Sequence, residues 1–144
     1  MKIIEYENKY RDDLIFMVLQ AKDALGKIPT LNEDLMDINA NYFQKGDKFW
    51  LAVDESDRVV GSIGFSTLQD NKEVRLHRLY VKANLKRQGI GSQLLTYAEE
   101  YLRSKSKKSV SVHLGEFKYY FESYLFYQKH GYKEYQPRYM IKFL

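Results

Sequence analysis

The feature that most constrains the fold is a row of three strands that runs into a strand-helix-strand unit. The three candidate strands are rich in alternating or β-branched apolar residues and span residues 48–54, 58–67 and 73–82. Short polar turns at residues 54–57 and 70–72 join them, so neighbouring strands are expected to be antiparallel. A helix at residues 89–104 then leads to a strand at residues 110–114, and such a unit forms a right-handed parallel crossover. The sequence therefore predicts a mixed, mostly antiparallel sheet.

The N-terminal part is predicted to add one strand and two helices. Residues 2–7 alternate charged and apolar side chains, as in a strand, and residues 8–25 carry apolar side chains at helical spacing. After a break at Gly26, a second helix is expected to begin at a cap, Thr30 or Asn32, and to continue through further apolar positions at helical spacing. The chain is therefore expected to begin β-α-α.

The C-terminal part is predicted to be a helix followed by two strands. The helix spans residues 119–130 and is stopped by Gly131, and the strands lie on either side of Pro137. The complete order is β-α-α-β-β-β-α-β-α-β-β, an α/β (α+β) fold with helices on both faces of one sheet. Because 144 residues are too few for two stable cores and no linker is apparent, residues 1–144 are expected to form a single domain.

The lack of cysteine excludes several kinds of site. A chain with no cysteine has no disulfide framework, no cysteine-based zinc site and no thiol nucleophile, and a reducing cytoplasm is its simplest location. The three histidines, His77, His113 and His130, lack the spacing of a metal motif, so no metal is expected. No apolar run approaches the length of a membrane span and the first residues do not resemble a signal peptide, so no membrane partner is expected.

Positive charge is concentrated in one stretch of the chain. The net charge of +4 is too small to indicate nucleic-acid binding by itself, and no nucleic-acid partner is expected. Five basic residues lie in a stretch that contains no acid before Glu99: Arg75, Arg78, Lys82, Lys86 and Arg87. An anionic ligand is therefore plausible beside this stretch, with a solvated basic surface as the alternative.

A glycine-containing turn joins the last strand of the row to the following helix. Gly89 and Gly91 remove side chains where the helix begins, so backbone N–H groups and the helix dipole can face an anion. Lys86 and Arg87 stand beside them. The turn fits neither a Walker A loop, because no lysine follows Gly91, nor a dinucleotide fingerprint, because Leu94 takes the place of the third glycine. A phosphate or pyrophosphate site of another kind is predicted, with a simple tight turn as the alternative.

This turn resembles the central signature of the GNAT superfamily of N-acetyltransferases. That signature is Arg or Gln, two residues, Gly, one residue, then Gly or Ala, and the run here is Lys86-Arg87-Gln88-Gly89-Ile90-Gly91. Two further runs are similar to family motifs: Arg78-Leu79-Tyr80-Val81 and Phe126-Tyr127-Gln128-Lys129-His130-Gly131-Tyr132. The matching element order and motif spacing cover almost the whole chain, so the resemblance implies a GNAT-like fold.

The resemblance implies acetyl-CoA as the acyl donor and indicates which residues bind it. The backbone amides expected to bind the CoA pyrophosphate are those of Arg87, Gln88, Gly89, Ile90, Gly91 and Ser92. The side chain of Lys86 or Arg87 is expected to help. The pantetheine arm is expected to lie along Leu79, Tyr80 and Val81 like an added strand, and the Val81 amide to polarise the thioester carbonyl.

Catalytic roles follow from the same resemblance. Tyr127 matches the tyrosine that protonates the departing thiolate, and a phenol with a pKa of about 10 is protonated at neutral pH. The general base is open. Glu73 and His77 lie on the strand where the family often places a base, and His113 and Glu116 are alternatives.

Four positions depart from residues that are common in the family. Lys86 replaces Arg or Gln in the signature and keeps the charge but has fewer fixed donors. Many members carry a glutamate where Arg75 stands, and a proline and an asparagine where Ala83 and Tyr120 stand. The missing glutamate leaves the base open, and the other two changes bear on the shape of the loops.

The implied function is direct transfer of an acetyl group from acetyl-CoA to an amine in a ternary complex. The acceptor is open between a small-molecule amine, an amino acid and a peptide N-terminus. It is expected to meet residues 26–32 and 114–119 and the turn at Pro137, because specificity usually lies on loops. Two alternatives are an enzyme for longer acyl chains and a non-catalytic CoA-sensing or protein-binding module. Three C-terminal aromatic residues leave a homodimer open: Tyr135, Tyr139 and Phe143.

Overall fold

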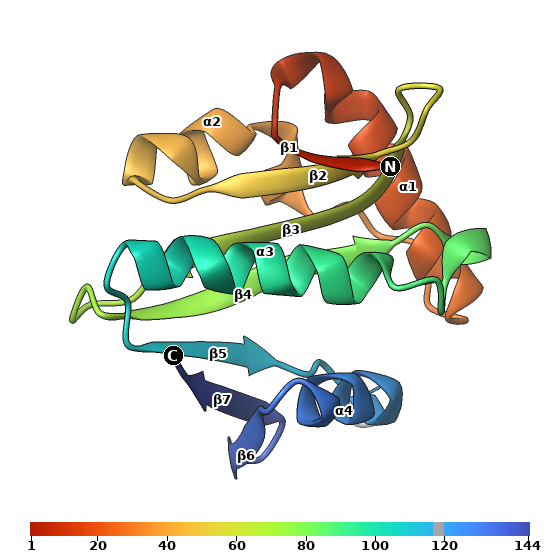
Figure 1. Ribbon diagram of the computed structural model, residues 1–144. Coiled ribbons are helices and arrows are strands. Elements are labelled where there is room, and N and C mark those ends of the chain that lie inside the picture. Colours follow the sequence, from red (N-terminus) through yellow and green to blue (C-terminus); the bar gives the residue numbers. More distant parts are fainter. Residues whose placement is uncertain (117–119) are drawn as a thin grey trace.

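The computed structural model describes residues 1–116 and 120–144 and is built on one seven-stranded sheet (Figure 1). The strands are β1 (Lys2–Glu5), β2 (Phe49–Val53), β3 (Val59–Thr67), β4 (Glu73–Val81), β5 (Ser109–His113), β6 (Lys133–Gln136) and β7 (Tyr139–Phe143). Their spatial order is β1-β2-β3-β4-β5-β7-β6. β4 and β5 are parallel and the other neighbouring pairs are antiparallel, so the predicted mixed, mostly antiparallel sheet is confirmed.

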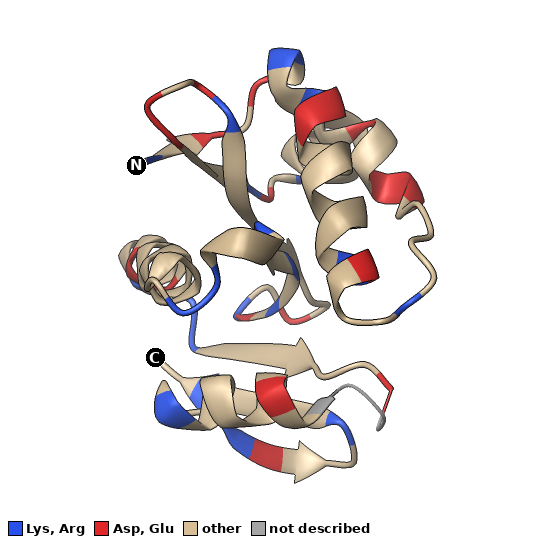
Figure 2. Ribbon diagram, turned by 90° about the vertical axis from the view of Figure 1, so that its right-hand side faces the viewer, with Lys and Arg blue, Asp and Glu red and all other residues tan. Residues whose placement is uncertain are grey.

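Helices cover the sheet on both faces, as predicted (Figures 1 and 2). The α-helices are α1 (Arg11–Ala24), α2 (Ile38–Asn41), α3 (Ile90–Ser104) and α4 (Tyr120–Lys129). Under α3 and α4 lies a core that includes Leu94 and Tyr127, and a second core on the face of α1 includes Leu14 and Leu35. Among the described residues, no helix is both long and apolar enough to cross a bilayer.

The predicted apolar stripes account for most of the helix packing. In α3, the side chains of Ile90, Leu94, Ala98 and Leu102 are all buried, as the spacing predicts. The boundaries differ by a few residues at the N-terminus, where a 3₁₀ turn, η1 (Asn8–Tyr10), precedes α1. The first residue of the helix expected at 119–130 lies outside the described residues, and α4 is described from Tyr120.

The prediction of one continuous second helix was wrong. This region contains a 3₁₀ turn η2 (Glu33–Met36), the short helix α2 and a further turn η3 (Phe43–Lys45). Asp37 separates η2 from α2 because its backbone is non-helical, at φ −146° and ψ 81°. The Ala40 N–H donates to Asp37 Oδ1 at 3.0 Å, so Asp37 caps α2. Asn32 is the N-cap residue of η2, as one of the two predicted caps, but its side chain makes no cap hydrogen bond. A short polar side chain that bonds nearby backbone competes with helix continuation in this way.

The parallel pair β4 and β5 separates soon after it forms. Their register extends only from Glu73, opposite Ser109, to Arg75, opposite Ser111. Beyond this point β4 continues to Val81 on its own course, and the two strands diverge in Figure 1. Within the described part of the chain, one edge of β4 therefore lacks a strand neighbour at its C-terminal end, next to the turn that leads into α3.

Candidate active site

The glycine turn exposes backbone donors at the start of α3. Arg87 and Gly89 both have left-handed backbones, with φ of 65° and 84°, and Gly89 supplies the conformation that side chains disfavour. The first backbone bond of the helix is donated by Gln93 to the Gly89 carbonyl, at 3.0 Å. The N–H groups of Ile90, Gly91 and Ser92 therefore have no acceptor within the helix. This arrangement is suited to an anion, as the sequence predicts.

The helix α4 packs directly against the glycine turn. The Phe126 ring lies 3.5 Å from the position that a Cβ on Gly91 would occupy, so the glycine permits close contact. The Ser92 Oγ and His130 Nε2 atoms are 2.9 Å apart. The Lys86 ammonium forms an ion pair with Glu122 at 3.5 Å. The two sequence motifs, about 40 residues apart along the chain, thus form one structural unit.

A β-bulge lies in the middle of β4. Four residues of β4, from His77 to Tyr80, lie opposite three residues of β3, from Ser62 to Gly64. Arg78 carries the irregularity, with φ at 56°, and the Ser62 hydroxyl donates to its carbonyl oxygen at 2.7 Å. A bulge re-aims side chains and interrupts pairing, and bulges are frequent beside active sites.

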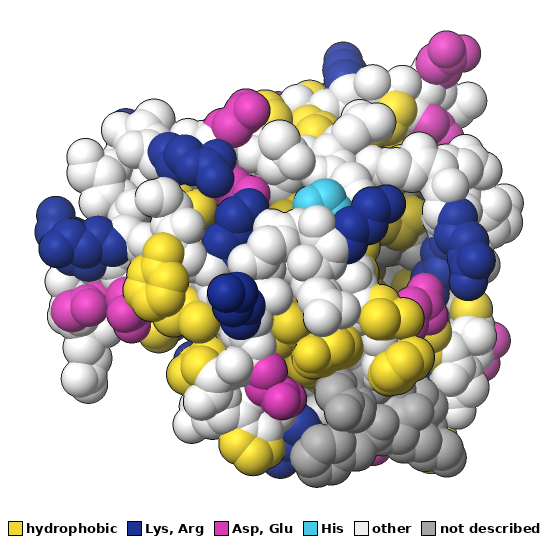
Figure 3. All heavy atoms as spheres, turned by 60° about the horizontal axis from the view of Figure 1, so that its bottom comes forward, with side chains coloured by type: hydrophobic (Ala, Val, Ile, Leu, Met, Phe, Trp, Pro, Cys, Tyr) yellow, Lys and Arg dark blue, Asp and Glu magenta, His cyan; other side chains and the backbone are white. Residues whose placement is uncertain are grey.

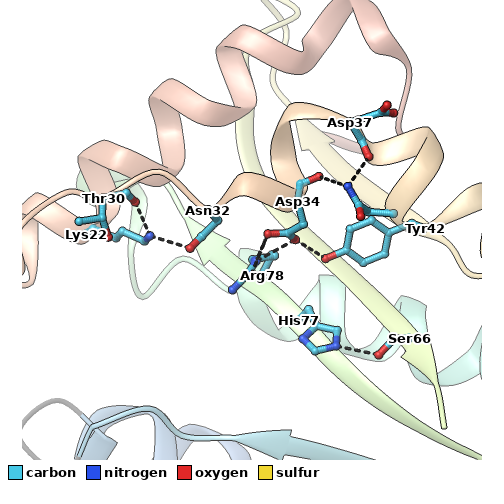
Figure 4. Close-up of polar contacts among 10 residues, drawn as sticks. Lys22, Thr30, Asn32, Asp34, Asp37, Tyr42, Ser66, His77 and Arg78 are labelled. Carbon is cyan, nitrogen blue, oxygen red and sulfur yellow. Dashed lines mark hydrogen bonds and ion pairs between the residues drawn. The ribbon is translucent and has the colours of Figure 1, made fainter. Parts of the chain in front are cut away.

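An ion pair with Asp34, in the 3₁₀ turn η2, holds the bulged residue Arg78 (Figure 4). Arg78 donates from Nε and Nη2 to the Asp34 carboxylate, at 3.0 and 2.8 Å, and the Tyr42 hydroxyl donates to the same carboxylate at 2.6 Å. Burial works against the charged form of Asp34. The hydrogen bonds from Arg78 and Tyr42 nevertheless outweigh burial and hold the pKa of its carboxyl below the ordinary value. The bulge is therefore held in place by η2.

A buried lysine ties α1 to the loop before η2, also shown in Figure 4. Lys22 is only 8% exposed and donates to the Thr30 carbonyl at 2.6 Å and to Asn32 Oδ1 at 2.9 Å. Burial lowers the pKa of this lysine, and the positive charge of Arg78 lowers it further. The sequence alone gives no sign of a role for Lys22 or Asp34, because each lies in a segment without a motif, and the partner of Asp34 is 44 residues away.

Tyr127 lies on α4 and faces the core below α3. Its ring packs against Phe126 and Tyr132, with both pairs of ring centroids 5.2 Å apart. Burial raises the pKa of the phenol, and Tyr80 raises it further. Within the described part of the chain, its hydroxyl has no hydrogen-bond partner. Tyr127 is therefore protonated at neutral pH and has a proton that it can donate.

His77 adjoins the bulge and is partly buried. Its Nε2 atom lies 2.8 Å from the Ser66 hydroxyl. Burial lowers the pKa of the imidazole, and the neighbouring positive charge of Arg78 lowers it further. The ring is therefore mainly neutral at pH 7 and is able to accept a proton.

The other candidate bases lie farther from the bulge. Glu73 begins β4 at its paired end, four residues before His77, or roughly 13 Å along a strand. His113 ends β5, where its ring contacts the tilted ring of Tyr139 with centroids 4.7 Å apart, and Glu116 is exposed. Within residues 1–116 and 120–144, no three histidine or carboxylate side chains are close enough to hold a metal ion.

Two curated proteins match most of the chain. The probable N-acetyltransferase 14 of Xenopus tropicalis is 27% identical over 103 residues, which are 72% of this chain and 50% of that protein. N-acetyltransferase 8 of Homo sapiens is 29% identical over 110 residues, or 73% of this chain and 47% of that protein. The chain thus spans about half the length of these curated relatives.

Solved structures match the fold over nearly the full length. An acetyltransferase of the GNAT family from Staphylococcus aureus Mu50 has a TM-score of 0.88 at 25% identity, covering 99% of this chain and 98% of that one. An acetyltransferase from Streptococcus agalactiae 2603 has a TM-score of 0.87 at 21% identity, with the same coverage. The model of the acetyltransferase (GNAT) family matches residues 16–132, which include both the glycine turn and Tyr127. With this match over most of its length and the same fold, the chain belongs to the GNAT acetyltransferase family.

Proposed function

We propose that the protein transfers an acetyl group from acetyl-CoA to an amine. The observation that carries this proposal is the unpaired edge of β4, which runs from the bulge to the glycine turn while α4 brings Tyr127 alongside. An extended arm can pair with such an edge as an added strand, and the anion-binding turn lies where that arm would end. Two proteins of the same fold were solved with CoA or acetyl-CoA, one from Thermoplasma acidophilum and one from Brucella melitensis.

The residues that would hold acetyl-CoA follow from the chemistry of its parts. The amides of residues 87–92 suit the pyrophosphate, with Lys86 and Arg87 as additional cations. Leu79, Tyr80 and Val81 offer backbone groups for the pantetheine arm, and the Val81 amide polarises the thioester carbonyl.

The reaction needs one proton acceptor and one proton donor. The amine nitrogen forms a bond to the carbonyl carbon and loses a proton to His77, with Glu73 as the other candidate base. The carbon–sulfur bond breaks, and Tyr127 donates its proton to the departing thiolate. Both protonation states are the ones that burial favours, since burial disfavours charged imidazole and charged phenolate.

Thermal unfolding with acetyl-CoA tests the donor assignment. A ligand present at about 100 times its dissociation constant stabilises the native state by about 2.7 kcal/mol, which raises the midpoint by several degrees. We expect this shift with acetyl-CoA and none with ATP or NAD as controls. A shift with ATP or NAD in place of acetyl-CoA would mean that the turn binds a different nucleotide.

The pH dependence of kcat/KM tests the base. Because the folded pKa of His77 is lowered, the wild-type activity is expected to persist below about pH 6.5 and to fall only as the ring becomes protonated. His77→Gln should remove this dependence, so the ratio of wild-type to variant kcat/KM should decline as the pH falls. Taking the ratio cancels titration of the acceptor amine. If Glu73→Gln removes the dependence and His77→Gln does not, Glu73 is the base.

The proposal also includes a cytoplasmic location and no nucleic-acid partner. A cytoplasmic location rests on the cysteine-free sequence. On the face seen in Figure 3, Lys and Arg side chains stand apart, separated by hydrophobic and polar side chains. A nucleic-acid site usually gathers basic side chains into one surface, and this face of the protein shows no such gathering among its described residues.

A further inference from the structure

Half of the sheet face on the side of α1 carries no described helix (Figure 2). Helix α1 packs over β3 and β4, whereas no described helix lies on the corresponding face of β5, β6 and β7. We call this surface, with Arg75, Ser111, His113, Tyr135 and Tyr139, the open face. It adjoins the bulge, because Arg75 precedes His77 by two residues, roughly 7 Å along a strand.

Arg75 is held on the open face by neutral groups from three other strands. Its Nε donates to the Ser111 hydroxyl at 3.2 Å, and Nη2 donates to the Tyr135 hydroxyl at 3.4 Å. The guanidinium also lies 4.9 Å from the centroid of the Tyr139 ring. These contacts from β5, β6 and β7 orient the guanidinium plane without neutralising its charge.

Arg75 has no counter-ion among the described residues. Two other arginines show the contrast, since Arg58 pairs with Asp13 and Arg78 with Asp34, each at 2.8 Å. Glu73 is two residues away along β4 but forms no ion pair with Arg75 in the described part of the chain. The three residues outside the description are Phe, Lys and Tyr and contain no carboxylate in their sequence.

Arg75 adds positive charge beside two histidines. Burial is the main reason why the pKa of His77 is lowered, and Arg78 and then Arg75 lower it further, against the opposing charges of Asp34 and Asp47. The pKa of His113 is lowered by burial, then by Arg138 and by Arg75. The carboxylate nearest the bulge, that of Asp34, is already neutralised by Arg78. A polycationic acceptor would be repelled here, and an anion would be attracted.

We propose that the acceptor amine carries a carboxylate and that Arg75 binds this carboxylate on the open face. This inference rests on the proposed acetyl transfer and specifies its substrate class. An oriented guanidinium with free donors forms paired hydrogen bonds with a carboxylate. Arg75 lies roughly 7 Å along the strand from His77, the candidate base, so one small molecule can place its amine at His77 and its carboxylate at Arg75, as in an amino acid.

Matched acceptor pairs test this inference. Each pair consists of an amino acid and the amine that lacks its carboxylate: tyrosine and tyramine, histidine and histamine, lysine and cadaverine. We expect kcat/KM to be at least about tenfold higher for the carboxylate member of the preferred pair, as for a hydrogen bond between charged groups. O-Phosphoethanolamine with ethanolamine as its control distinguishes a phosphate from a carboxylate. Equal or better activity with the amines in every pair, or with the phosphate compound alone, would overturn the inference.

The variant Arg75→Gln assigns the effect to this side chain. We expect KM for the amino acid to rise about 10- to 100-fold with little change in kcat, and KM for the decarboxylated amine to stay constant. Arg103→Gln, an exposed arginine in the last turn of α3, is the matched control and should leave both constants unchanged. An equal loss for both members of a pair would indicate a structural role and contradict the inference.

Binding measurements separate this inference from the proposed function. Calorimetry with CoA present should show the amino acid binding at least about tenfold more tightly than the amine, and Arg75→Gln should remove the difference. Acetylation of neutral amines without this preference would leave acetyl transfer intact and overturn the carboxylate inference. If no amino acid in the panel binds, the inference is likewise wrong, whether or not acetyl-CoA is a substrate.

Discussion

Replacement of Tyr127 by phenylalanine is expected to lower kcat by about 100-fold or more. The ring packs in the core below α3, so phenylalanine preserves the packing and removes only the hydroxyl. General acid catalysis typically contributes about 10²- to 10⁴-fold, and no other hydroxyl is assigned to the thiolate here. Steady-state rates of CoA release measure kcat, and the shift in the unfolding midpoint with acetyl-CoA shows that binding is retained.

Tyr101→Phe is the control for this substitution. Tyr101 is a partly buried tyrosine near the end of α3, where its ring contacts Trp50, and its loss of a hydroxyl should leave kcat unchanged. Full activity of Tyr127→Phe would show that the thiolate is protonated by another donor or by water. A wild-type protein that binds acetyl-CoA but acetylates no amine would instead support the non-catalytic CoA-sensing module.

Replacement of Glu99 by alanine is expected to destabilise the fold by about 3 kcal/mol, or about 10 °C in the unfolding midpoint. Glu99 lies on α3, is 4% exposed, and accepts hydrogen bonds from the Tyr132 hydroxyl at 2.7 Å and from Lys142 at 3.0 Å. Tyr132 immediately precedes β6 and Lys142 lies on β7, so both donors come from the C-terminal part of the chain. Removing the carboxylate leaves a buried hydroxyl and a partly buried ammonium without their acceptor, which costs more than the loss of an exposed pair.

Two further variants make the stability measurement specific. Glu100→Ala removes the neighbouring, exposed carboxylate and should change stability by about 0.5 kcal/mol or less. Glu99→Gln keeps an acceptor for Tyr132 and loses the charge opposite Lys142, so its effect should be intermediate. Chemical denaturation measures all three, and equal midpoints for Glu99→Ala and Glu100→Ala would show that the buried carboxylate does not join α3 to the C-terminal part of the chain.

The sequence predicted the element order because the responsible signals are local. The stripe of Leu94, Ala98 and Leu102 is set by helical period, and it is buried as predicted. The turn at Gly89 requires a left-handed backbone, which glycine adopts readily. The prediction of one continuous second helix was wrong because the local signal is ambiguous. An aspartate such as Asp37 can lie on the exposed side of a helix, or it can cap a new helix and so divide the segment in two.

The sequence by itself thus determined the element order and predicted the glycine turn as an anion site and Tyr127 as a candidate acid, because periodicity, glycine and motif spacing act over a few residues. Only the tertiary structure decided which side chains meet. Asp34 lies 44 residues from Arg78 in the sequence. Nothing in either segment indicates that the Asp34 carboxylate pairs with Arg78 and holds the bulge of β4 in place. In the sequence, Arg75 is one of five basic residues in the same stretch and nothing distinguishes it from the others. The structure shows that its side chain donates to two neutral hydroxyl groups, those of Ser111 and Tyr135. Contacts between segments that are distant in sequence depend on how the helices pack on the sheet, and local sequence patterns do not predict that packing.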